Sequence, residues 1–191
     1  MRKLLTIPTI LTWVRIFILP IIVVIFYIPD NYLVMESKNL IATIIFIFAA
    51  VTDYLDGYLA RLLKQETSFG AFLDPVADKA IVVACLVILV FLHRTFWWGA
   101  IVIISREIAI SALREWMAQI GNKKNIAVAY IGKIKTTIQM IAIGLLLFDY
   151  HGAVINSNYL GNICMVIAVI TTIISMLYYL HQAHKQFKHI E

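Results

Sequence analysis

Four aspartates stand at helical spacing in one stretch of this chain, as Asp53-x-x-Asp56 and then Asp74-x-x-x-Asp78. Residues three or four apart on a helix lie about one turn apart on one face, so each pair can point its carboxylates in the same direction. Two such faces brought together collect four negative charges, which hard divalent cations such as Mg²⁺ or Mn²⁺ neutralise well. The stretch therefore predicts a metal site built from carboxylate oxygens.

Small and cationic residues follow the first pair of aspartates. Gly57 and Ala60 leave a strip with little side-chain bulk, where a ligand can approach the backbone. Arg61 can hold a phosphate through two parallel hydrogen bonds. A metal beside an arginine suits phosphoryl transfer, in which positioning and charge neutralisation do most of the work, and Asp78 is a candidate general base for an attacking hydroxyl. The alternative is that the acids are solvated helix ends.

Composition indicates which elements position these residues. The chain has 191 residues, of which 62% are hydrophobic and only 14% are charged, and this argues against a water-soluble domain. Apolar stretches long enough to cross a bilayer as helices occur at about 10–28, 39–61, 73–93, 96–118, 133–149 and 158–181. We therefore predict an all-α, polytopic membrane protein with six transmembrane helices. We expect one domain over residues 1–191, with residues 1–9 as a short interfacial segment.

The positions of Lys and Arg indicate an orientation. Under the six-span arrangement, most basic residues fall on one side, and the opposite loops hold only Lys38 and Arg94. Cytoplasmic flanks are enriched in positive charge, so we expect both termini and the aspartate cluster on the cytoplasmic side of a cell membrane. The net charge of +5 fits anionic lipid headgroups beside the spans better than nucleic acid.

The string from Asp53 to Asp78 resembles the signature of the CDP-alcohol phosphatidyltransferases. That signature is Asp-x-x-Asp-Gly-x-x-Ala-Arg, eight intervening residues, and Gly-x-x-x-Asp-x-x-x-Asp, and every position matches here. The resemblance implies a six-helix homodimer in which one or two Mg²⁺ or Mn²⁺ ions hold the substrate diphosphate and an acceptor hydroxyl attacks the β-phosphorus and expels CMP. The implied metal ligands are Asp53, Asp56, Asp74 and Asp78, with Asp78 as the base. The implied contacts to CDP-diacylglycerol are Asp53, Gly57, Ala60, Arg61, Thr67 and Asp74.

A second resemblance lies near the N-terminus. The run from Pro8 to Arg15 is similar to the family's Pro-Asn-x-Leu-Thr-x-x-Arg opening, except that Thr9 stands where Asn is usual. Thr12 and Arg15 are therefore further candidate contacts to CDP-diacylglycerol. The alternative is a helix cap and an arginine that snorkels at the membrane boundary.

A second charged group bears on the acceptor alcohol. Arg106, Arg114, Lys133 and Lys135 outnumber Glu107, which we expect to pair with only one of them, so the others are free to receive a phosphate. The two lysines also fit plain cytoplasmic positive charge. The segments around Arg106 and Lys135 resemble those of bacterial phosphatidylglycerophosphate synthases, a branch of the family. This implies transfer of the phosphatidyl group from CDP-diacylglycerol to sn-glycerol 3-phosphate, giving phosphatidylglycerol phosphate and CMP.

Other functions remain open at this stage. Within the family, the acceptor could be inositol phosphate, or phosphatidylglycerol in a reaction that forms cardiolipin. From a different class, a divalent-metal or ion-coupled transporter also uses membrane carboxylates. A transporter needs a site near the bilayer midplane, whereas these aspartates lie toward one surface. A purely structural membrane subunit is the remaining reading.

Overall fold

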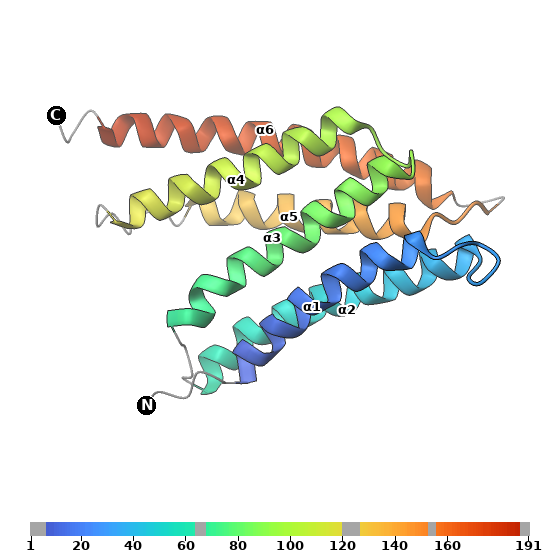
Figure 1. The fold of residues 1–191 in the computed structure, drawn as a ribbon. Coiled ribbons are helices and arrows are strands. Elements are labelled where there is room, and N and C mark those ends of the chain that lie inside the picture. Colours follow the sequence, from blue (N-terminus) through green and yellow to red (C-terminus); the bar gives the residue numbers. More distant parts are fainter. Residues whose placement is uncertain (1–6, 64–67, 120–126, 153–155, 188–191) are drawn as a thin grey trace.

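The computed structural model describes residues 7–63, 68–119, 127–152 and 156–187, and this part of the chain contains helices and no strand (Figure 1). The prediction of an all-α fold is confirmed. The helices are α1 (Ile7–Tyr27), α2 (Met35–Leu63), α3 (Ser68–Phe91), α4 (Trp97–Gln119), α5 (Ala127–Phe148) and α6 (Ser157–Phe187).

The helices form an up-and-down bundle with α3 near its centre. In Figure 1, α1 and α2 lie together on one side, α4, α5 and α6 lie on the other, and α3 crosses between them. Contacts of α3 with α1, α4 and α5, and of α2 with α5, join the two sides. Because the helices alternate in direction, the end of α2, the start of α3 and the start of α5 lie at the same end of the bundle. This end carries the predicted aspartates.

The helices extend beyond the apolar stretches that predicted them. Helix α2 begins at Met35, α3 at Ser68 and α5 at Ala127, each several residues before the expected span, and α6 continues to Phe187. Hydropathy marks only the part of a helix that suits hydrocarbon, whereas backbone hydrogen bonding continues past it. Helix α1 begins at Ile7, inside the segment 1–9 that we expect at the interface, and that interfacial position stays a prediction. Residues 1–6 lie outside the described residues.

Within the described residues, two helices are long and apolar enough to cross a membrane by length and hydropathy, over Met35–Asp53 and Ser157–Tyr178. Shorter apolar stretches occupy Thr12–Tyr27 and Lys135–Phe148. The interior of the bundle is filled by buried apolar side chains such as Phe46, Leu86 and Met165. Its outside is apolar as well, with many large side chains about half exposed, which is unusual for a protein that meets water on all sides.

At the end of the bundle opposite the aspartates, α3 and α5 finish in left-handed caps. His93 has a φ of 55°, its N–H bonds to Val90 O, and the N–H of Arg94 bonds to Leu89 O, which is the Schellman arrangement. Asp149 has a φ of 48° after α5, and its N–H bonds to Leu145 O. The two caps thereby place the side chains of Arg94 and Asp149 beside each other.

Arg94 is buried in this corner and closes the end of α5. Its Nη1 donates to two carbonyl oxygens at the end of α5, those of Leu147 at 3.1 Å and Leu146 at 3.4 Å. Its Nη2 donates to Asn39 Oδ1 at 2.8 Å, and its Nε lies 3.0 Å from Asp149 Oδ2. The last carbonyls of a helix lack partners within the helix and favour a cation. Burial lowers the pKa of Arg94, and the charge of Asp149 opposes that shift. Arg94 is therefore a structural clasp between α2, α5 and the α3–α4 loop.

Lys38 closes the end of α1 in the way that Arg94 closes the end of α5. It is buried, its Nζ donates to the carbonyl oxygen of Ile28 just after α1, and it lies 2.6 Å from Asp30 Oδ1. Lys38 and Arg94 are the two cations that the sequence places on the side poor in positive charge. Their acidic partners and helix carbonyls give each of them a structural reason to be there.

Removing the Arg94 clasp should destabilise the bundle. We expect Arg94→Ala to lower the free energy of unfolding by about 3 kcal/mol, because it leaves Asp149 and the α5 carbonyls without their buried partner. In a chain of this length, that corresponds to a fall in melting temperature of roughly 6–12 °C, measurable by thermal unfolding in detergent. Glu36→Ala, at the same end but exposed, is the control and should leave the melting temperature almost unchanged. Equal melting temperatures for both variants would contradict the clasp.

Candidate active site

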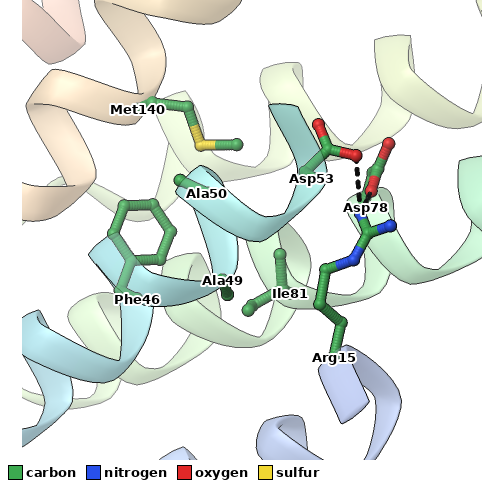
Figure 2. Close-up of a pocket in the computed structure, with 8 residues that line it drawn as sticks. All are labelled: Arg15, Phe46, Ala49, Ala50, Asp53, Asp78, Ile81 and Met140. Atoms are coloured by element: carbon green, nitrogen blue, oxygen red, sulfur yellow. Dashed lines mark hydrogen bonds and ion pairs between the residues drawn. The ribbon is translucent and has the colours of Figure 1, made fainter. Parts of the chain in front are cut away.

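Two of the predicted aspartates meet at one arginine. Nη1 of Arg15 on α1 lies 2.6 Å from Oδ1 of Asp53 on α2, and the same nitrogen donates to Oδ1 of Asp78 on α3 (Figure 2). The Arg15 side chain is only 2% exposed, whereas those of Asp53 and Asp78 are 43% and 38% exposed. The carboxylates of α2 and α3 therefore converge, as the sequence predicted, with a buried cation between them and open space beside them.

Local sequence explains this convergence. Ala49 and Ala77 are buried, and each lies within about one turn of its aspartate, so little bulk separates α1, α2 and α3 at this level. Thr12, one turn before Arg15, is fully buried on the same face of α1. The predicted pair Thr12 and Arg15 thus points into the bundle and toward the site, which argues against an arginine that snorkels to the surface.

The oxygen atoms brought together here fit a hard divalent cation. Asp53 and Asp78 supply carboxylate oxygens from two helices, and both already hold one positively charged group between them. Among the side chains that the structure describes, no group of three or more His, Cys, Asp or Glu residues forms a metal site. The other half of the predicted set, Asp56 and Asp74, has side chains outside the described part. The described half has the donor chemistry that the prediction requires.

Several predicted residues are placed by their backbone alone. Asp56, Gly57, Ala60 and Arg61 lie on α2, Asp74 lies on α3, Arg114 on α4 and Lys133 on α5. The prediction that each aspartate pair lies on a helix is confirmed by these placements. Thr67 lies outside the described residues. The contacts assigned to all of these side chains stay predictions.

The second charged cluster forms around Glu107. Oε1 of Glu107 on α4 accepts from Nζ of Lys135 on α5 and lies 3.4 Å from Nη1 of Arg106. The prediction that Glu107 pairs with only one cation is therefore wrong, because one carboxylate oxygen serves both side chains. Lys135 is fully buried and Arg106 is 4% exposed, so both cationic groups are held inside the bundle.

Helix α5 connects the two charged groups. Met140 lines the same small pocket as Arg15, Asp53 and Asp78, and it stands five residues after Lys135 on α5, a rise of about 7.5 Å. Met140 reaches the carboxylate pair, and Lys135 lies about one and a half turns nearer the start of α5.

Sequence reasoning missed one member of this cluster. Oγ of Ser175 on α6 accepts a hydrogen bond of 2.6 Å from Nη2 of Arg106, and Ser175 is buried. Thr172 is fully buried one turn earlier. Two small polar residues three apart within a largely apolar stretch of α6 are a signal for an inward polar face, and that signal could have identified Ser175.

Comparison with known proteins agrees with this geometry. Residues 5–174 match the model of the family described as CDP-alcohol phosphatidyltransferase. The chain belongs to the CDP-alcohol phosphatidyltransferase family. It is 52% identical over 182 residues to a protein of Haemophilus influenzae, covering 93% of this chain and 92% of the relative. A relative from Salmonella choleraesuis is 47% identical over 180 residues, covering 93% and 94%. Both relatives are named CDP-diacylglycerol–glycerol-3-phosphate 3-phosphatidyltransferase.

Proposed function

We propose that this protein transfers the phosphatidyl group of CDP-diacylglycerol to sn-glycerol 3-phosphate, releasing CMP and forming phosphatidylglycerol phosphate. The names of relatives with about half of their residues identical support both substrates. The observation that carries the acceptor is the buried cluster of Lys135, Arg106 and Glu107, which places two cationic side chains inside the bundle. A phosphorylated acceptor would bind such cations through charged hydrogen bonds.

The carboxylates on α2 and α3 perform the chemistry. Asp78 accepts the proton of the acceptor hydroxyl as its oxygen bonds to the β-phosphorus, and the bond from that phosphorus to the CMP oxygen breaks. Asp53, Asp56, Asp74 and Asp78 would hold one or two Mg²⁺ or Mn²⁺ ions, whose charge neutralises the diphosphate. The side chains of Asp53 and Asp78 are partly exposed, so substrate and ions can reach them.

The remaining predicted residues hold the two substrates. The contacts to CDP-diacylglycerol come from two residues of α1, three of α2 and one between α2 and α3. These residues are Thr12 and Arg15, then Gly57, Ala60 and Arg61, and then Thr67. Lys135 and Arg106 bind the acceptor phosphate, with Arg114 and Lys133 nearer the surface. Glu107 holds Lys135 and Arg106 in place through its shared oxygen. Because both cations are buried, a phosphate that reaches them exchanges water for charged hydrogen bonds.

We further propose that all six helices cross the cell membrane, with the termini and the active site on the cytoplasmic side and two copies forming a homodimer. The exposed apolar side chains on the outside of the bundle suit lipid, for example Phe17, Val87 and Ile174. The even number of crossings brings both ends of the chain to the side of the aspartates. That side also carries most of the lysines and arginines.

The test is a release assay for CMP with purified protein, CDP-diacylglycerol, Mg²⁺ or Mn²⁺, and a panel of acceptors. We expect CMP release with glycerol 3-phosphate and little with inositol phosphate or phosphatidylglycerol. A chelator should abolish it. CMP release that depends on one of the other acceptors would overturn the assignment, and metal uptake by vesicles without a lipid product would favour a transporter.

Arg15 gives a test of the metal site that does not depend on turnover. Its guanidinium binds Oδ1 of both Asp53 and Asp78, so a divalent cation has to take these oxygens from it. We expect Arg15→Gln to bind Mn²⁺ several-fold more tightly in calorimetry, because removing the inner cation leaves the two carboxylates less neutralised. Lys38→Gln, which removes a buried cation at the other end, should not change Mn²⁺ affinity. Equal or weaker binding by Arg15→Gln would contradict a metal at this pair.

A further inference from the structure

Two buried polar side chains on α5 and α6 are not explained by the fold. Gln139 on α5 is 3% exposed, and Thr172 on α6 is fully buried. Within the part of the chain that the structure describes, neither Oε1 of Gln139 nor Oγ1 of Thr172 has a hydrogen-bond partner. Buried polar atoms are almost always hydrogen-bonded, because an unpaired one destabilises the fold. Each of these two atoms therefore has a hydrogen bond left for a ligand.

The hydroxyl group of Thr172 differs from those of three other threonines in the bundle. Thr43, Thr52 and Thr171 each donate to a carbonyl oxygen one turn earlier in their own helix, at 2.7–2.9 Å. This bond is a common way for a threonine to satisfy its hydroxyl inside a helix. Thr172 does not form it, so its hydroxyl can bond to a group outside α6.

Helix packing places Thr172 at the level of Lys135. A Cβ added at Gly161 would lie 2.7 Å from Leu146 Cγ, so these two positions face each other where α5 and α6 pack antiparallel (Figure 1). Thr172 lies eleven residues after Gly161, and Lys135 lies eleven residues before Leu146. Equal rises along antiparallel helices bring Thr172 and Lys135 to the same depth. Thr172 therefore lies at the level of the buried cluster around Glu107.

Gln139 stands between two groups that the proposed reaction uses. It follows Lys135 by four residues, which puts both side chains on one face of α5 about one turn apart. It directly precedes Met140, which lines the small pocket with Asp53 and Asp78. Along α5, Gln139 therefore comes after the proposed phosphate site and at the level of the carboxylate pocket.

Glycerol 3-phosphate has a group for each of these places. Its phosphate suits the buried cations, and its primary hydroxyl, the less hindered of the two, is the nucleophile for the β-phosphorus. The secondary hydroxyl, on the carbon between them, is not consumed, and inside the bundle it needs hydrogen-bond partners of its own. The amide oxygen of Gln139 accepts a hydrogen bond, and the hydroxyl of Thr172 both donates and accepts.

We propose that Gln139 and Thr172 bind the secondary hydroxyl of the acceptor and thereby select glycerol 3-phosphate over phosphorylated alcohols that lack this group. This rests on the proposed function, because the acceptor and its phosphate site are taken from it. A buried site that hydrogen-bonds a substrate hydroxyl rejects an analogue without that hydroxyl, because the analogue leaves the polar atoms of the protein unpaired.

The first experiment changes the acceptor and leaves the protein as it is. CMP release is measured with CDP-diacylglycerol, Mg²⁺ and either glycerol 3-phosphate or 3-hydroxypropyl phosphate, which lacks only the secondary hydroxyl. We expect kcat/KM to be about 10–100-fold higher with glycerol 3-phosphate, the combined effect of two hydrogen bonds. Equal values, as expected if the two side chains only hold a water molecule, overturn the proposal. Wild-type protein that releases no CMP with either acceptor refutes the proposed function and, with it, the ligand named here.

The second experiment removes the polar atoms from two different helices with little change in volume, through Gln139→Met and Thr172→Val. Each variant should lower kcat/KM for glycerol 3-phosphate about 3–10-fold and leave that for 3-hydroxypropyl phosphate within about twofold. Thr171→Val is the control, because the hydroxyl of Thr171 already bonds within α6, and it should keep the wild-type ratio. An equal loss with both acceptors overturns the proposal, because a purely structural role predicts that result.

Melting temperature separates recognition of the hydroxyl from folding. Thr172→Val replaces an unpaired buried hydroxyl by a methyl group, so we expect its melting temperature in detergent, without substrates, to equal or exceed that of the wild type. A lower melting temperature together with an unchanged ratio of kcat/KM for the two acceptors would show that Thr172 serves the fold, and it would overturn the proposal.

Discussion

Replacing Asp78 by asparagine is expected to reduce CMP release by about 10²–10⁴-fold, the usual contribution of a general base. Asparagine keeps the shape of the side chain but removes the charge that binds Arg15 on α1. Asp78 is partly exposed and stands where α3 meets α1 and α2, so the substitution need not disturb the apolar core. The measurement is kcat for CMP release at saturating CDP-diacylglycerol and glycerol 3-phosphate.

The matched control is Asp30→Asn, the same chemical change at the opposite end of the bundle. Asp30 also binds a buried cation, Lys38, but lies far from the carboxylate pair along both helices. We expect its kcat to stay within about twofold, since surface carboxylates contribute little. If Asp78→Asn kept a rate within threefold of the wild type, Asp78 would not be the base. Mn²⁺ binding by Asp78→Asn then separates the two roles, because a residue that acts only as a base leaves Mn²⁺ affinity unchanged.

The helices and the meeting of the carboxylates were predictable because they depend on periodic patterns. Asp53 and Asp78 come together because α1 packs against both α2 and α3, and Arg15 of α1 contacts both carboxylates. The apolar stretches also identified each helix in the part of the chain that the structure describes, although not its ends. A helix boundary depends on single hydrogen bonds, such as those of the left-handed cap at His93, and hydropathy does not record them.

The partners of the charged residues were not predictable. Glu107 and Lys135 lie on different helices, and their contact depends on how α4 and α5 rotate about their axes, which a single sequence does not fix. The same holds for Ser175, which reaches Arg106 across the α4–α6 contact, and for the clasp of Arg94. Counting charges in the sequence showed that cations outnumber Glu107 in these segments. It did not show that one oxygen of Glu107 binds two of them.

Replacing Lys135 by methionine is expected to raise the KM for glycerol 3-phosphate by about 10–100-fold, because a hydrogen bond between charged groups contributes about 1.5–3 kcal/mol. Methionine fills much of the same space in this fully buried position, and Arg106 remains as a partner for Glu107. The KM for CDP-diacylglycerol should change little, since the carboxylate pair on α2 and α3 is untouched. The measurement is initial rate against each substrate in turn.

Lys38→Met is the matched control, because Lys38 is, among the side chains that the structure describes, a second buried lysine that binds a carboxylate. Both substitutions remove a buried ion pair and should lower the melting temperature, so a loss of stability alone would affect them alike. Only Lys135→Met should change the KM for glycerol 3-phosphate. A similar rise in KM for both substrates, or an unchanged KM for glycerol 3-phosphate, would remove Lys135 from the acceptor site. The phosphate would then have to bind through Arg114 or Lys133, closer to the surface than the buried cluster around Glu107.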